Sequence, residues 1–184
     1  MPSHGTFPLA KRSMASAAND GMGRADIRIF SDASRMESGL GSAAVLYCPG
    51  HPEMVLRVHF PASVHTLTSL DGEIIGLTLA LILLGHFLSR ADTAKACRVS
   101  IGCDNTSAID FSRKRTSRTE VVLNSLMAQL KSSRPQVKLS FHHVKGHSGI
   151  PGNQRANAEA RRVAQDETCS TAMRLPPSLR RLRG

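Results

Sequence analysis

Aromatic side chains are scarce in this 184-residue chain, which has six Phe, one Tyr and no Trp. This scarcity argues against a protein that binds single strands by stacking bases on aromatic platforms. Cysteines are also few, and Cys48, Cys97, Cys103 and Cys169 form no CxxC pair. Without a recognisable secretory signal, this pattern favours reduced thiols, and we expect an intracellular protein, nuclear or cytoplasmic.

Acidic residues are outnumbered, with 14 Asp and Glu against 24 Lys and Arg, so the formal net charge is +10. This excess favours an anionic partner, most often nucleic acid held through its phosphates. A basic protein without such a partner is the alternative. Long apolar runs are lacking too. The longest, Ile74–Leu84, is too short to span a bilayer and predicts a buried helix, so we expect no membrane partner.

The length fits one domain with short extensions, and we expect a monomer. Residues 1–25 lack hydrophobic periodicity and are rich in small and polar side chains, which predicts a flexible leader. Residues 26–167 form the predicted folded domain. Residues 168–184, which end in LPPSLRRLRG, form a predicted basic tail.

Hydrophobic periodicity predicts the order of the elements. Apolar runs between turn residues indicate three antiparallel strands, at Ile27–Ser31, Ala43–Tyr47 and Met54–Phe60. Helical spacing then continues from Thr68 to Arg90. The remaining elements are strands at Arg98–Cys103 and Val137–His143, a short helix at Asn105–Phe111, an amphipathic helix at Thr119–Leu130, and a last helix from Pro151 to near Asp166. This order predicts an α/β fold, with a mixed five-stranded sheet of three antiparallel and then two parallel strands, flanked by helices on both faces.

Three acidic residues stand where metal ligands are common. Asp32 and Asp104 follow predicted strands, and ligands of open α/β sheets gather at such strand ends. Glu73 lies near the start of the first long helix, beside the face that would pack on the sheet. A buried carboxylate is costly unless a cation neutralises it, and converging carboxylates suit Mg²⁺. Each acid alone has a simpler explanation; Asp104, for example, precedes a helix that it could cap.

Four motifs give the chain a resemblance to the type 1 ribonuclease H family, above all to the domains attached to retroelement reverse transcriptases. They are IFSDAS followed by Gly39-x-Gly41-x-Ala43, LDGEIIGL at Leu70–Leu77, IGCDNTSAI around Asp104, and VKGHSGIPGNQRAN ending at Asn157. The resemblance covers about Ile27–Ala164, and the last motif is the most specific.

The resemblance implies a ribonuclease H fold that hydrolyses the RNA strand of RNA–DNA hybrids with two Mg²⁺ or Mn²⁺ ions. Asp32 would bridge both metals, Glu73 and Asp104 would complete one metal site, and Asn157 would serve the other. His147, on a loop, would assist proton movement or product release, a role to which an imidazole is suited. RNA–DNA hybrid is therefore the expected partner, and double-stranded RNA is a further candidate.

Asn157 departs from the family, which has an aspartate at this position. An amide still offers a carbonyl oxygen but brings one negative charge fewer, so we expect weakened catalysis. Glu159 lies two residues further on, about 200° around a helix axis, and is not expected to replace it. The alternative function is an inactive domain, derived from a retroelement, that binds nucleic acid without cutting it.

Other residues are candidates for contact with nucleic acid. The basic run Arg113–Arg118 follows the short helix and suits a phosphate backbone, although an ordinary solvated loop is an equal alternative. Ser34 and Thr106 carry groups that could bind phosphate or the ribose 2′-hydroxyl, by which proteins separate RNA from DNA. The full expected set is Ser34, Asn105, Thr106, Arg113, Lys114, Arg115 and Arg118.

Two further functions are disfavoured by the sequence. His142, His143 and His147 do not predict a zinc site, because adjacent strand residues point to opposite faces and no cysteine pair lies at ligand spacing. A transposase or integrase of the same fold is disfavoured by the GHSGIPGN loop and by Glu73 on the first helix.

Overall fold

The computed structural model describes residues 22, 24–63, 66–91, 95–110, 117–146, 148–171 and 175–183. Its elements, in chain order, are β1 (Ile27–Met36), β2 (Gly39–Tyr47), β3 (Met54–Pro61), α2 (Ser69–Arg90), β4 (Cys97–Cys103), α3 (Thr106–Ile109), α4 (Arg118–Ser133), β5 (Val137–His143), α5 (Pro151–Gln165), the 3₁₀ turn η3 (Glu167–Cys169), α6 (Pro177–Arg180) and the 3₁₀ turn η4 (Arg181–Arg183).

The strands form one sheet in the order β3-β2-β1-β4-β5. β2 pairs antiparallel with both β1 and β3, whereas β4 pairs parallel with both β1 and β5. The prediction of a mixed sheet with three antiparallel and two parallel strands is therefore confirmed.

β1 is longer than predicted, because it continues five residues beyond Ser31 to Met36. The prediction that this strand ends before Asp32 was wrong. Beyond Ser31 the strand is poor in apolar side chains, so the sequence pattern fades. Its backbone nevertheless stays paired with β2 as far as a two-residue turn, where Met36 faces Gly39. Asp32 consequently lies inside a paired strand, opposite Ala43.

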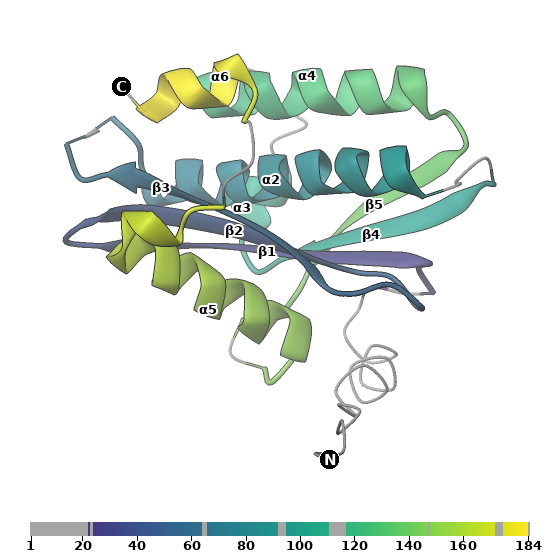
Figure 1. Cartoon of the computed structure of the whole chain (residues 1–184), viewed down its shortest axis with the longest axis horizontal. Coiled ribbons are helices and arrows are strands. Elements are labelled where there is room, and N and C mark those ends of the chain that lie inside the picture. Colours follow the sequence, from purple (N-terminus) through teal and green to yellow (C-terminus); the bar gives the residue numbers. More distant parts are fainter. Residues whose placement is uncertain are drawn as a thin grey trace, which may run out of the picture.

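Helices cover both faces of the sheet, as predicted. Figure 1 shows α2 and α4 on one face and α5 on the other. The α2 face holds the larger core, to which buried Ile75, Leu77 and Leu84 contribute. On the other face α5 lies very close to β2, because a Cβ atom on Gly41 would stand 2.2 Å from the carbonyl oxygen of Ala160. This close approach gives a physical reason for the second glycine of the Gly-x-Gly-x-Ala motif.

α2 is apolar enough to resemble a membrane-spanning helix by composition, with a mean hydropathy of 1.8 over its most apolar 18-residue window. However, 78% of that window is buried within the protein. The helix begins at a capping box in which the Thr68 side chain and Asp71 exchange hydrogen bonds with each other's backbone N–H groups. Its apolar surface is therefore covered by the sheet and by α4, as in an ordinary core helix.

Packing extends beyond the predicted domain at both ends. Met22, which was predicted to lie in a flexible leader, is 1% exposed, and its carbonyl oxygen accepts a hydrogen bond from Ser100 Oγ. In the predicted basic tail, Leu175, Leu179 and Leu182 join the main core, and α6 packs on α4. These leucines have the i, i+4, i+7 spacing of a helix face, but proline and arginine residues between them obscured that signal. Residues 1–21 lie outside the described part of the chain.

Candidate metal centre

The site is built where β1 and β4 separate. These parallel strands pair from Ile27 and Val99 as far as Phe30 and Gly102. Asp32 and Asp104 each stand two residues beyond that last pair. Both carboxylates therefore occupy the same edge of the parallel part of the sheet, where the backbones diverge and leave room for a ligand.

Glu73 is brought to this edge by the close packing of α2 on β1. A Cβ atom on Gly76 would lie 3.2 Å from the backbone oxygen of Asp32, so the first turns of α2 rest directly on the strand. One ligand atom each from Glu73, Cys103 and Asp104 lie within 4.8 Å of one another. The structure thus assembles two of the predicted acids with the thiol of Cys103.

The electrostatics of this cluster favour a bound cation. Burial, followed by the negative charges of Asp32 and Asp104, raises the pKa of the Glu73 carboxyl to about 8. Hydrogen bonds from the Cys103 thiol, with Sγ 3.7 Å from Oε2, and from the Ala33 N–H lower this pKa only in part. Carboxylates that repel one another in a desolvated place are stabilised when a divalent cation binds between them.

The donor set fits a hard divalent ion such as Mg²⁺ or Mn²⁺. Asp32, which is 2% exposed, accepts a hydrogen bond from the Ala33 N–H at 2.8 Å through Oδ1. Together with Glu73 and partly buried Asp104 it offers carboxylate oxygens, which these ions prefer. Burial and the Glu73 carboxylate raise the pKa of the Cys103 thiol, which donates a hydrogen bond to Glu73 Oε2.

Asp104 does not cap the helix that follows it. That role belongs to Asn105, whose Oδ1 accepts a hydrogen bond from the Ala108 N–H at 3.1 Å. The capping explanation for Asp104 is therefore wrong, and its carboxylate is left to the cluster. The same bond occupies one lone pair of the Asn105 side-chain oxygen, and the amide N–H₂ group is the part of this side chain suited to phosphate oxygens.

The segment that follows β5, from Val144 to Gly146, packs against Asp104. Val144 N–H donates to the Cys103 carbonyl at 2.9 Å, and a ring nitrogen of His143 lies 3.2 Å from the Asp104 carbonyl oxygen. A Cβ atom on Gly146 would come within 2.9 Å of Asp104 Oδ2, so the glycine lets the backbone pass close to the carboxylate. His147, the predicted catalytic histidine, follows directly and lies outside the described residues.

Asn157, the predicted fourth ligand, lies on α5 and is partly buried. Within the described part of the chain its side chain makes no hydrogen bond or ion pair. One turn earlier on the same helix, buried Asn153 carries a side-chain oxygen without a hydrogen-bond partner among the described residues. The role of Asn157 as a metal ligand therefore stays a prediction.

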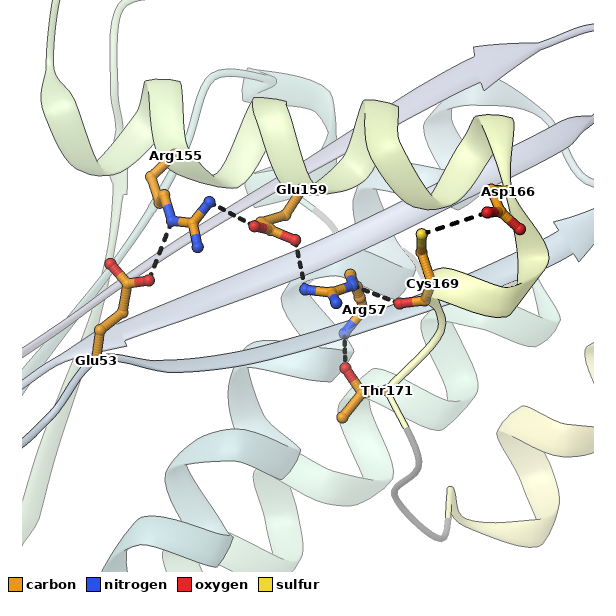
Figure 2. A network of polar contacts seen from close by, with 7 residues as sticks. All are labelled: Glu53, Arg57, Arg155, Glu159, Asp166, Cys169 and Thr171. Carbon is orange, nitrogen blue, oxygen red and sulfur yellow. Dashed lines mark hydrogen bonds and ion pairs between the residues drawn. The ribbon is translucent and has the colours of Figure 1, made fainter.

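Glu159 is engaged in a different place. Figure 2 shows its carboxylate between two guanidinium groups, those of Arg57 on β3 and Arg155 one turn earlier on α5. Arg155 also pairs with Glu53 at 3.0 Å. Glu159 is only 2% exposed, so this network holds its carboxylate inside the protein. This agrees with the expectation that Glu159 does not replace an acid at position 157.

The network also ties α5 to β3 and to the segment that follows it. Arg57 donates through Nε to the Cys169 carbonyl and through its backbone N–H to Thr171 Oγ1 at 3.0 Å (Figure 2). The rotation of α5, and hence the direction of Asn157, is therefore fixed from the opposite side of the helix. No motif in the sequence indicated Arg57, because its partner lies about a hundred residues away.

The remaining predicted contacts with nucleic acid are distributed over three elements. Ser34 is partly buried on β1 and faces Gly41, while Thr106 is exposed at the start of α3. Arg118 is exposed at the first position of α4. The predicted residues Arg113, Lys114 and Arg115 lie outside the described residues.

Comparison with known proteins identifies relatives of this fold. A model of the RNase H family matches residues 24–165. RNase H1 from the halophilic archaeon Halobacterium salinarum NRC-1 is similar in structure, with a TM-score of 0.53 and 15% identity over 76% of this chain and 97% of that chain. A comparison with curated proteins finds no match.

Two further structures are similar at low identity. LC11-RNase H1, solved in complex with an RNA/DNA hybrid, has a TM-score of 0.53 and 18% identity over 72% of this chain and 91% of that chain. The protease–reverse transcriptase of Prototype Foamy Virus has a TM-score of 0.51 and 14% identity, covering 77% of this chain but 21% of that chain. At these identities the likenesses establish the architecture.

Proposed function

Since the chain belongs to the RNase H family, we propose that it hydrolyses the RNA strand of RNA–DNA hybrids by a two-metal mechanism. The observation that carries the proposal is the convergence of Glu73 and Asp104 beside Asp32, with a Glu73 pKa raised to about 8 by burial and by the other two carboxylates. Repulsion between these desolvated carboxylates destabilises the metal-free protein, and bound divalent cations reduce it.

In this proposal Asp32, Glu73 and Asp104 hold two Mg²⁺ or Mn²⁺ ions, with Asn157 contributing its carbonyl oxygen. When bound, such ions activate water and stabilise the leaving oxygen of a phosphodiester. The chain itself keeps the donors in place. Ala33 N–H orients the Asp32 carboxylate, and the Cys103 thiol orients that of Glu73.

Proton transfer and product release are assigned to His147. This residue follows Gly146, whose backbone lies against the Asp104 carboxylate. A histidine in such a position can accept and release protons near neutral pH.

The amide of Asn157 favours a second candidate function. With one negative charge fewer than an aspartate, the centre attracts divalent ions less strongly, so cleavage is slower than with four acids. If the loss is complete, the chain binds hybrid without cutting it. This non-catalytic function would suit a domain derived from a retroelement reverse transcriptase.

The proposed partner is the RNA–DNA hybrid, with double-stranded RNA as a weaker ligand. We assign phosphate and 2′-hydroxyl contacts to Ser34, Asn105, Thr106 and Arg118, together with the basic residues Arg113, Lys114 and Arg115. The protein is proposed to act as a monomer, in the nucleus or cytoplasm.

The two functions are separated by comparing four labelled substrates: RNA–DNA hybrid, double-stranded RNA, double-stranded DNA and single-stranded RNA. Each is incubated with the protein and Mg²⁺, then Mn²⁺, and binding is measured in parallel. Cleavage of RNA in the hybrid alone supports the enzyme. Tight binding of the hybrid with no cleavage in either metal overturns the enzyme and leaves the binding domain.

A further inference from the structure

The C-terminal segment adds a surface that the family match does not include. The match ends at residue 165, whereas the described chain continues through α6 and η4. Leu179 is fully buried, and Leu175 and Leu182 are 7% and 8% exposed, so the segment is part of the core. In Figure 1 it lies beside α4 at one end of the helical layer. The segment is thus a fixed feature of the fold.

A groove of about 380 Å³ runs between this segment and the first turns of α4. It is lined by Ser117, Arg118, Val121, Val122, Ser178, Arg181 and Leu182. Arg118 and Arg181 are exposed, and so is Val121, at 55%. None of the described residues that line the groove is acidic. It therefore combines an apolar floor with two guanidinium groups and two hydroxyl groups.

The groove is connected to the candidate metal centre through the first turns of α2 and α4. Thr119 Oγ1 donates to Asp71 Oδ1 at 2.7 Å, which joins the two helix starts. Asp71 precedes Glu73 by two residues, about 3 Å along the helix axis and about 200° around it. The groove and the centre therefore lie on different sides of the first turn of α2, and a polymer held at the centre reaches the groove by passing over that turn.

We propose that this groove binds the sugar–phosphate backbone of the nucleic acid beside the metal centre, a proposal that rests on the proposed function. Guanidinium groups bind phosphate oxygens in a bidentate manner, and serine hydroxyls donate to them. The apolar side chains suit the less polar sugar faces between phosphates. The net charge of +10 favours a polyanion as the occupant.

The first test is the salt dependence of hybrid binding, measured by fluorescence anisotropy in EDTA so that cleavage does not interfere. Each phosphate contact adds about one unit to the slope of log affinity against log salt. Arg118→Ala and Arg181→Ala should each reduce the slope by about one unit and weaken binding about 5- to 10-fold near physiological salt. Arg181→Lys should retain the slope. Arg161→Ala and Arg162→Ala, on the exposed face of α5, should match the parent.

A matched pair of substitutions at Val121 separates the effect of side-chain charge from that of side-chain shape. Val121→Glu and Val121→Gln add side chains of nearly equal size at an exposed position, and a glutamate near the start of a helix does not destabilise it. The glutamate variant should bind hybrid at least 5-fold more weakly than the glutamine variant. Equal affinities for this pair, with unchanged slopes for the arginine variants, would overturn the proposal that the groove binds nucleic acid. An acidic peptide, or no ligand, would then be its occupant.

Failure of the groove and failure of the proposed function give different results. If the parent binds hybrid but never cuts it, and the groove variants bind more weakly, the groove is supported as a binding site and the proposed nuclease activity is contradicted. If the parent cuts hybrid while the groove variants keep the parental affinity and slope, the nuclease activity is supported and the groove is contradicted as a binding site. A parent that does not bind hybrid overturns both.

Discussion

In the proposed mechanism, Asn157 sets how strongly the candidate centre attracts a second metal ion. It is partly buried, and its side chain makes no hydrogen bond or ion pair to another described residue. Its amide can present a neutral oxygen, where an aspartate would present a charge. The difference lies in electrostatics rather than in shape, because the two side chains are nearly the same size.

We therefore predict that Asn157→Asp increases cleavage. The added charge should lower the Mg²⁺ concentration at half-maximal activity and raise the rate at limiting Mg²⁺ by at least about tenfold, equivalent to 1.4 kcal/mol. A titration of Mg²⁺ against the single-turnover rate measures this. Ala158→Asp is the matched control, because it adds the same charge at the next, exposed position of α5 and should behave as the parent. Equal effects of both substitutions would contradict a ligand at position 157.

Glu73 makes the stability of the metal-free protein depend on pH. Its pKa is about 8 in the folded state and near 4.3 in an unfolded chain. Between these values the folded state holds a proton that the unfolded state has lost. The free energy of unfolding should therefore decrease as the pH rises from about 5 to 8.

The check is denaturant unfolding in EDTA across that pH range. Glu73→Gln, which cannot ionise, should show a flatter profile than the parent. Mg²⁺ should reduce the decrease in the parent, because it favours the ionised carboxylate and binds only the folded site. Parallel pH profiles for the parent and Glu73→Gln would show that Glu73 is not the group responsible.

At the scale of elements, α5 is held by charge as well as by packing. Glu159 lies between Arg57 and Arg155, and Arg57 also contacts the backbone after α5 (Figure 2). Removing one partner of a buried ion pair leaves the other charge uncompensated. The helix that presents Asn157 is therefore sensitive to a residue that points away from the metal centre.

Glu159→Gln should lower the free energy of unfolding by about 3 kcal/mol. Urea denaturation measures the change, with Glu37→Gln as the control. Glu37 is exposed in the turn between β1 and β2, and its substitution should change stability by less than about 0.5 kcal/mol. A loss of similar size in both variants would mean that the network contributes no special stability.

Much of the element order could be predicted from periodicity alone. α2 and β5 were identified close to their true bounds, because their apolar residues recur at regular spacing, buried in α2 and partly buried in β5. β1 was cut short at Ser31, since the rest of this strand is held by pairing with β2 and not by apolar side chains. α6 was missed because its leucines are few and stand among prolines and arginines.

The candidate site was also partly predictable from local sequence patterns. Glu73 and Asp104 could be proposed because a helix start and a strand end are visible in the sequence. Asp32 was proposed at a strand end that the structure does not have, since β1 continues to Met36. The contact of Cys103 with Glu73, and the approach of Gly146 to Asp104, depend on how α2 and a loop pack on the sheet. Side-chain contacts between distant segments, such as that of Arg57 with Glu159, follow from the tertiary structure and have no local signal.

Over the whole molecule, charge is divided between two roles. Three acids gather where β1 and β4 separate, while a net charge of +10 remains over the chain. A polyanion attracted by the basic surface is thereby brought to a centre that needs divalent cations. This division matches the requirements of a metal-dependent nuclease.

The central claim is that the acids at this edge of the sheet use divalent metal to cut RNA paired with DNA. Its most direct test is the single-turnover cleavage of end-labelled RNA in a hybrid, comparing the parent with Asp32→Asn and Asp104→Asn at saturating Mn²⁺. The parent should cut the RNA, and each substitution should lower the rate by at least about a hundredfold, equivalent to 2.7 kcal/mol. Cleavage that persists at the parental rate in both variants would contradict the claim.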